Sequence, residues 1–217
     1  MTAQLSDAEA VRRLPWYYAH NGANNLFSVL TWFGPVFVLF LNELGLPKTR
    51  IGFLLSLLPF AGVVALFIAP AVARAGLKRV FLACWGLRKL VTAGLLLTPW
   101  VAARSSPDGA FLYVLGLMVL FALLRAVAET AWVPWAQEIV PAAVRGRVHG
   151  INNVVGLLCN STALLCASWI LGRGTGLDRF LYLIAAGVGF GVLCVLFGAA
   201  VPGGGRGHLR ETAPTVS

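Results

Sequence analysis

The chain of 217 residues is strongly apolar: 59% of its residues are hydrophobic, only 12% are charged, and its mean hydropathy is +0.81. A soluble domain of this length cannot bury so much apolar surface, so the composition excludes a soluble globular protein and predicts an integral membrane protein. The formal net charge is +9. The basic residues gather between the apolar runs, so we interpret this charge as one that sets the membrane topology and contacts anionic lipids. We therefore expect no nucleic-acid partner.

Six apolar runs follow one another and predict one bundle of six transmembrane helices over residues 26–201. Roughly 20 helical residues cover about 30 Å of hydrocarbon, so we interpret each run as one crossing. Residues 1–25 are interpreted as a cytoplasmic leader with the start of the first helix. Residues 202–217, which open with Pro-Gly-Gly-Gly, are interpreted as a disordered cytoplasmic tail. The runs are Leu26–Leu41, Ile51–Ala73, Val80–Ala103, Ala110–Val133, Val148–Leu171 and Phe180–Val201.

The basic residues between the runs favour one orientation. With the N-terminus in the cytoplasm, the inside segments carry nine Lys and Arg residues and the outside segments five. The positive-inside rule then predicts that both termini are cytoplasmic. We expect the membrane to be a bacterial inner membrane. The inside residues are Arg12, Arg13, Arg74, Lys78, Arg79, Arg145, Arg147, Arg206 and Arg210, and the outside residues are Lys48, Arg50, Arg104, Arg173 and Arg179.

One sequence pattern occurs twice. The segments Arg74–Leu82 and Arg173–Leu181 both contain Gly-Leu-x-Arg followed by apolar residues, at equivalent places in each group of three spans. Since three is odd, the two hairpins lie on opposite sides of the membrane. This arrangement predicts an inverted three-plus-three repeat, as in many secondary transporters. The alternative is coincidence in a chain rich in Gly, Leu and Arg.

The sixth run contains two glycines spaced four residues apart. Gly187 and Gly191 form a small-xxx-small face on the predicted helix. Such a face lets two helix backbones approach closely. We therefore predict that this side of the sixth span packs against another helix.

Ionisable residues inside the runs are the first candidates for function, since charges within a membrane segment are costly and usually face a cavity or protein. Arg125 and Glu129 are spaced i, i+4 and can form an ion pair on one helix face. They are interpreted as a gating or proton-coupling pair, or else as a static pair near the interface. Arg88 and Lys89 either line a cytoplasmic vestibule or are ordinary positive-inside residues at the start of the third span, and the second interpretation is preferred.

Polar and aromatic residues in the first and fifth runs are the candidates for a substrate cavity: Asn24, Asn25, Trp32 and Asn160. Trp32 either stacks on a substrate or packs in the core, and the amides either bind a solute or bridge helices. The Gly34-Pro35 step predicts a kink in the first helix. A basic vestibule favours anionic substrates, whereas Trp32 and the amides favour sugars or amphipathic compounds.

Two segments resemble the major facilitator superfamily of transporters. The block from Arg125 to Gly150 is similar to the region between the fourth and fifth helices, with connecting residues Glu138, Pro141, Arg145, Gly146 and Arg147. The hairpin between spans two and three resembles the signature loop, usually Gly-x3-Asp-Arg-x-Gly-Arg-Arg, at Arg74, Gly76, Lys78 and Arg79. Ala69 and Ala73 replace the first Gly and the Asp of that loop, so the Asp that latches one conformation in the family is missing.

The resemblance implies the N-terminal six-helix half of a secondary active transporter, which moves a small solute by alternating access and for which protons are a candidate driving ion. It also implies a second six-helix half, either another copy or a separate C-terminal half. The alternatives are a non-transporting membrane subunit or a truncated inactive relic. An enzyme is not expected, since no Gly-x-Ser-x-Gly stretch is present and no histidine sits mid-span to activate a serine. We expect no cofactor and no metal site.

Overall fold

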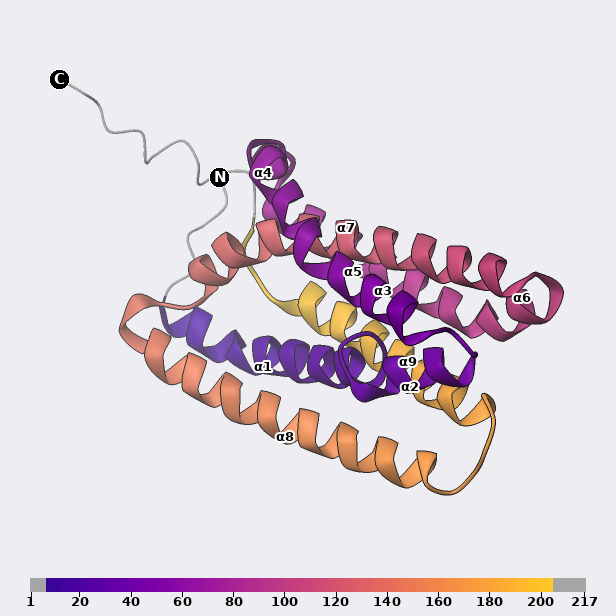
Figure 1. The fold of residues 1–217 in the computed structure, drawn as a ribbon. Coiled ribbons are helices and arrows are strands. Elements are labelled where there is room, and N and C mark those ends of the chain that lie inside the picture. Colours follow the sequence, from indigo (N-terminus) through magenta and orange to yellow (C-terminus); the bar gives the residue numbers. More distant parts are fainter. Residues whose placement is uncertain (1–6, 205–217) are drawn as a thin grey trace.

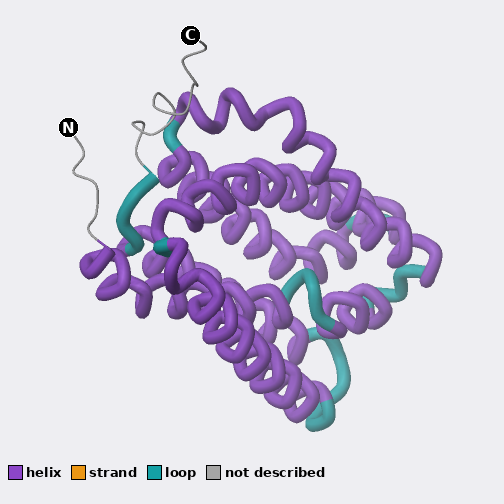
Figure 2. The backbone as a smooth tube through the Cα atoms, turned by 90° about the vertical axis from the view of Figure 1, so that its left-hand side faces the viewer, coloured by secondary structure: helices purple, strands orange, loops and turns teal. Residues whose placement is uncertain are grey.

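The computed structural model of the protein describes residues 7–204, and within this range the regular elements are nine α-helices joined by short turns (Figures 1 and 2). Three of these turns are short 3-10 segments. The prediction of an all-α protein is confirmed for this part of the chain. The helices are α1 (Asp7–Leu30), α2 (Pro35–Glu43), α3 (Lys48–Phe60), α4 (Val64–Ala75), α5 (Leu77–Ala93), α6 (Thr98–Arg104), α7 (Pro107–Ile139), α8 (Arg145–Leu171) and α9 (Asp178–Ala200).

Five segments are long and apolar enough to cross a membrane, and a sixth candidate is broken. Five of the six predicted spans therefore have a counterpart of membrane-spanning length: Val11–Glu43, Leu77–Arg104, Asp108–Ile139, Ala142–Leu171 and Asp178–Ala200. The predicted second span is bent by 67° between Lys48–Val63 and Phe67–Ala75. Pro59 lies in the last turn of α3 and Gly62 follows in a 3-10 turn, a sequence that interrupts the helical hydrogen bonds. The structure therefore gives five candidate spans, or six if the bent pair counts as one, and the six-span prediction is confirmed only in part.

The first span begins earlier than its apolar run. It covers Val11–Glu43 and contains most of the predicted leader, because α1 continues through the polar residues between His20 and Asn25. His20 is buried there, and its Nδ1 lies 2.8 Å from the carbonyl oxygen of Cys194. The predicted kink is confirmed, since α1 ends at Leu30 and α2 starts at Pro35.

The glycine face of α9 packs against α1, as predicted. A Cβ atom added at Gly187 would lie 2.7 Å from Thr31 Cγ2, and one at Gly191 would lie 2.9 Å from Phe27 Cδ2. Both distances are far below an ordinary carbon–carbon contact of about 3.5–4.0 Å. Only glycine therefore permits the observed approach of the two helices.

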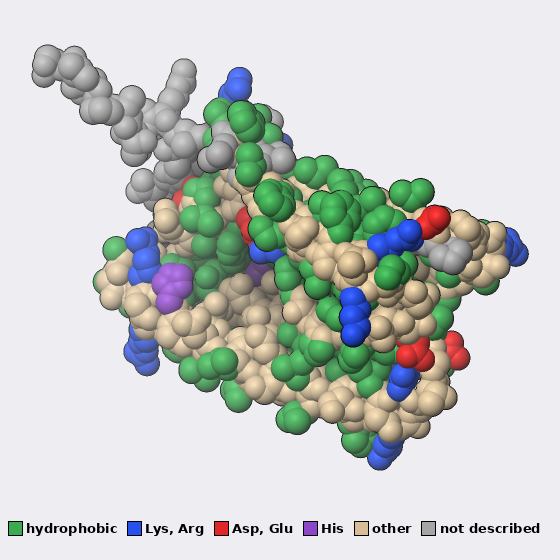
Figure 3. Space-filling view, in the orientation of Figure 1, with side chains coloured by type: hydrophobic (Ala, Val, Ile, Leu, Met, Phe, Trp, Pro, Cys, Tyr) green, Lys and Arg blue, Asp and Glu red, His purple; other side chains and the backbone are tan. Residues whose placement is uncertain are grey.

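Large apolar side chains cover the long sides of the bundle, whereas most charged side chains lie toward its ends (Figure 3). Helix α8 exposes such residues along its whole length: Ile151, Val154, Leu157, Leu158, Leu164, Leu165 and Trp169. Outward apolar faces on helices of this length are what a lipid environment requires. The five long apolar helices fit an integral membrane protein.

The described start of α1 and end of α9 lie at the same end of the bundle, which we call the terminal end (Figure 1). At the other end, two ion pairs join the connections between helices: Arg50–Asp108 at 2.6 Å and Arg179–Glu43 at 3.5 Å. The two turns that carry the repeated Gly-Leu-x-Arg pattern also lie at different ends of the bundle. Gly76 lies in the turn between α4 and α5, and Gly176 lies in the turn between α8 and α9. Both glycines have positive φ angles, +99° and +91°.

Candidate functional site

Two adjacent cations lie in the interior of the bundle. Arg88 and Lys89 are each only 2% exposed. They belong to α5, where Arg88 comes eleven residues after Leu77, about 16 Å along the helix axis. The preferred interpretation of both as residues at the start of the span is therefore wrong. Burial of a charged group carries a desolvation cost of several kcal/mol, so its neighbours have to account for its presence.

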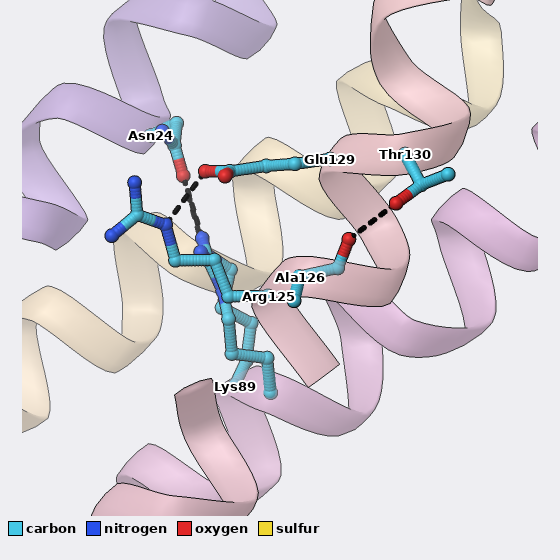
Figure 4. A network of polar contacts seen from close by, with 7 residues as sticks. Asn24, Lys89, Arg125, Ala126, Glu129 and Thr130 are labelled. Atoms are coloured by element: carbon cyan, nitrogen blue, oxygen red, sulfur yellow. Dashed lines mark hydrogen bonds and ion pairs between the residues drawn. The ribbon is translucent and has the colours of Figure 1, made fainter. Parts of the chain in front are cut away.

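Both cations converge on one amide oxygen. Asn24 Oδ1 on α1 accepts hydrogen bonds from Arg88 Nη2 at 3.0 Å and from Lys89 Nζ at 3.3 Å (Figure 4). Aromatic rings cover the remaining faces of the two charges. Arg88 Cζ lies 3.5 Å from the ring centre of Trp85, and Lys89 Nζ lies 3.3 Å from that of Phe27. A desolvated cation–π contact contributes about 2 kcal/mol, so the rings offset part of the desolvation cost.

The two cations have no acidic partner among the side chains that the structure describes. Within the same part of the chain, Arg88 Nε is buried and has no hydrogen-bond partner. The nearby carboxylate of Glu129 is already paired, since its Oε1 lies 2.6 Å from Arg125 Nε on the same helix, α7. Figure 4 shows Arg125 and Glu129 in the same group of polar contacts as Asn24 and Lys89. We call Asn24, Arg88, Lys89, Arg125 and Glu129 the polar cluster; with three cations and one carboxylate, its formal charge is +2.

A cavity of about 450 Å³ adjoins the polar cluster. Arg125 and Glu129 line it from α7, and Pro59 and Gly62 line it at the break of the bent second span. Its volume is within the range of about 300–1,000 Å³ that is usual for small-molecule sites. The predicted pair Arg125–Glu129 therefore lines this open space, whereas the buried cations Arg88 and Lys89 do not. The other lining residues are apolar: Phe33, Leu55, Leu58, Ala61, Ala122 and Ala126.

The structure brings one of the four predicted cavity residues, Asn24, into the polar cluster. Trp32 is buried in the core, where its Nε1 donates to Thr92 Oγ1 at 2.7 Å, so its packing role is the one observed. Asn25 lies at the contact between α1 and α8, with its Nδ2 donating to the Asn21 carbonyl at 2.9 Å. Asn160 on α8 has a buried Oδ1 without a hydrogen-bond partner in the described residues, but it lines neither this cavity nor a smaller one of about 190 Å³ at the terminal end.

The residues of the signature-like loop and the helix 4–5 connection meet at the terminal end. Lys78 Nζ donates to the carbonyls of Ala199 at 2.8 Å and Val201 at 2.6 Å, and Glu138 Oε2 accepts from Gly204 N at 3.0 Å. Residues 202–204 of the predicted tail are thus held against α5 and α7, whereas 205–217 lie outside the described residues.

The other matched residues have local roles. Arg74 Nε donates to the Pro70 carbonyl at 3.2 Å, and Arg145 Nη2 donates to the Val140 carbonyl at 3.4 Å. Pro141 precedes the short turn between α7 and α8. Arg79, Gly146 and Arg147 are exposed, as expected for residues at the surface of the terminal end.

Sequence reasoning underrated Arg88 and Lys89 because its preferred interpretation let the third span begin later than Val80, which left both as ordinary positive-inside residues. A usable signal was present in the spacing, since Trp85 precedes Arg88 by three residues and so shares its helix face. Within the described residues, no three His, Cys, Asp or Glu side chains form a group that could hold a metal ion.

The fold and the site together define an all-helical protein whose long apolar helices fit a membrane and enclose a cationic centre. In comparisons with known proteins, the chain matches no family model, no curated protein and no solved structure.

Proposed function

We propose that the chain is a six-span half of a secondary active transporter, which moves a small solute through the bundle interior by alternating access. The observation that carries this proposal is the polar cluster beside the 450 Å³ cavity in the middle of apolar helices. Charged residues within membrane segments mark solute and ion pathways, because a merely structural position would be filled at lower cost by an apolar side chain.

The course of the chain supports the same proposal. Broken helices line the sites of many transporters near the middle of the membrane, and the break of the second span at Pro59 to Gly62 lines this cavity. The two turns with the repeated Gly-Leu-x-Arg pattern, at Gly76 and Gly176, lie at different ends of the bundle, as an inverted repeat requires. We propose such a repeat, with both termini in the cytoplasm of a bacterial cell.

A second six-helix half belongs to the proposal, because one half cannot enclose a solute pathway by itself. The apolar face of α8 is largely exposed, so the second half can pack against part of this face while lipid covers the rest. Another copy of this chain and a separate C-terminal half are the two candidates. Cross-linking in the membrane distinguishes them, since only the first yields a homodimer.

Within this mechanism, Arg125 and Glu129 form the gate on the cavity side. Protonation of Glu129 would break its 2.6 Å contact with Arg125 and free the guanidinium for the solute. Solute binding and proton binding would then depend on each other through one carboxylate, which is the simplest form of proton coupling.

The test is solute-dependent current across a supported membrane of proteoliposomes under an imposed pH gradient. The wild-type chain, alone or with its partner half, is expected to give a current that changes with pH. Glu129→Gln is expected to abolish the pH dependence, whereas Asp178→Asn, at an exposed carboxylate at the start of α9, leaves it unchanged. Wild-type rate and pH dependence in Glu129→Gln would contradict the coupling role. No flux with any solute would favour a non-transporting subunit.

A further inference from the structure

The polar cluster also points to the chemistry of its ligand. We propose that Arg88 and Lys89 bind a small doubly charged oxyanion, such as a dicarboxylate or a phosphate, in the bundle interior. This inference rests on the proposed function, because it names the substrate class of the same site. It can be tested by binding alone, without any measurement of transport.

The first argument is the absence of a counter-charge. Arg88 and Lys89 are almost completely buried, and no described carboxylate pairs with either. Structural cations in a membrane segment are normally paired with an acidic residue, because an isolated charge is poorly tolerated there. Two neighbouring unpaired cations repel each other as well. A bound anion removes both problems at once.

The second argument is the geometry at Asn24. Its Oδ1 lies within 3.3 Å of both Arg88 Nη2 and Lys89 Nζ, so the two donors converge on one point. A neutral amide oxygen is a weak acceptor for two full charges, and a ligand carboxylate or phosphate oxygen that displaced Asn24 Oδ1 would make stronger, charge-assisted hydrogen bonds. Arg88 Nε, buried and without a partner in the described chain, remains available as a further donor.

The third argument is the orientation of the donors. The guanidinium of Arg88 stacks on Trp85, with Cζ 3.5 Å from the ring centre, so the ring covers its face and leaves its edge to hydrogen bonding. Lys89 is held similarly over Phe27. Such fixed donors need little rearrangement to bind an anion, and a fork-like guanidinium edge fits carboxylate and phosphate oxygens.

The fourth argument is the total charge. The cluster has three cations and one carboxylate, so two positive charges remain to be neutralised. A dianion does this, whereas a monoanion leaves one charge uncompensated and a neutral sugar leaves both. Trp32, the aromatic residue predicted to stack on a sugar ring, lies in the core and does not line the 450 Å³ cavity. The anionic alternative from the sequence is thus favoured over the sugar alternative.

The experiment is calorimetric titration of the purified full chain in lipid nanodiscs. Succinate and inorganic phosphate are the two test anions, and chloride and glucose are controls. The expected result is saturable binding of one or both dianions and no binding of glucose. Succinate without phosphate identifies a carboxylate site, and phosphate without succinate identifies a phosphate site. Absence of saturable binding of both dianions to the folded wild-type chain would overturn the proposal.

Asn24→Asp provides a variant that is expected to remain folded. It places a carboxylate of nearly the same shape where Asn24 Oδ1 meets both cations. The thermal midpoint should rise, and dianion binding should weaken by roughly 30-fold or more, because the site now contains its own anion. The matched control is Asn21→Asp, one turn earlier on α1, where the side chain donates to the Tyr17 carbonyl instead; it should lower the midpoint.

A second pair of variants tests the donors directly. Lys89→Met should also weaken dianion binding by roughly 30-fold or more. Lys48→Gln, which removes an exposed cation at the start of α3, should leave binding unchanged. Equal binding by Lys89→Met and wild type would overturn the assignment. Dianion binding without flux would contradict the proposed transporter function but support the dianion site. Flux of a neutral solute without dianion binding would support the transporter function but contradict the dianion site.

Discussion

The packing of α9 against α1 gives a quantitative prediction for Gly187→Ala. The added Cβ would lie 2.7 Å from Thr31 Cγ2 and 3.1 Å from Leu30 Cβ. Thr31 cannot rotate away at low cost, because it is fully buried and its Oγ1 donates to the Phe27 carbonyl at 2.7 Å. The two helices therefore have to separate by several tenths of an ångström, and other contacts along their interface loosen.

Overpacking of this kind typically costs about 1–3 kcal/mol. The matched control is Gly189→Ala, two residues along the same helix, where an added Cβ meets no atom within 4 Å. Both variants gain the same helix propensity, about 1 kcal/mol for replacing Gly by Ala. The difference between their free energies of unfolding therefore isolates the clash, and we expect Gly187→Ala to be the less stable by about 1–3 kcal/mol.

The measurement is reversible unfolding in mixed detergent micelles, with the helical circular dichroism signal recorded against the fraction of denaturing detergent. Both variants and the wild type are compared at the same lipid content. If Gly187→Ala and Gly189→Ala agree within about 0.5 kcal/mol, the scatter of neutral surface substitutions, then α1 and α9 do not approach each other as described.

Two further predictions use the same assay. Thr92→Val should lower the free energy of unfolding by about 1–3 kcal/mol, because the buried indole N–H of Trp32 loses its acceptor; Thr130→Val, whose hydroxyl contacts only its own helix, is the control, and equal losses would contradict the reasoning. Lys78→Met should cost about 1–2 kcal/mol by removing a cation from the C-terminal carbonyls of α9. It should also speed protease cleavage near residues 201–204, unlike Arg79→Gln at an exposed position, and unchanged cleavage would count against the contact.

Hydropathy predicted most of the spans because the apolar composition of a span can be read from the residues of that span alone. It failed at the second span, since mean hydropathy does not register whether a helix is continuous. Pro59 and Gly62 were visible in the sequence, but many transmembrane helices tolerate such residues when neighbours satisfy the backbone. The Gly187–Gly191 face was predicted correctly, since a small-residue spacing has one dominant use in a helix.

The site was harder to predict because it is assembled between helices. Asn24 and Arg88 come from different helices, α1 and α5, and no spacing along the chain shows that they meet. Arg125 and Glu129 were found because they share one helix face. Trp32 was placed among the cavity candidates on its chemistry alone, and its partner Thr92, which explains its burial, is sixty residues away.

The contact between α1 and α9 has a consequence for the way the protein is made. Among the described helices, α1 emerges first from the ribosome and α9 last. Two interior polar side chains of α1 contact partners that come later: His20 contacts the Cys194 carbonyl on α9, and Asn24 contacts Arg88 on α5. During synthesis, α1 therefore has to wait beside the insertion machinery with these groups unsatisfied. The bundle closes only when its last helix arrives, so truncation within α9 should leave the first helix poorly inserted and open to quality-control proteases.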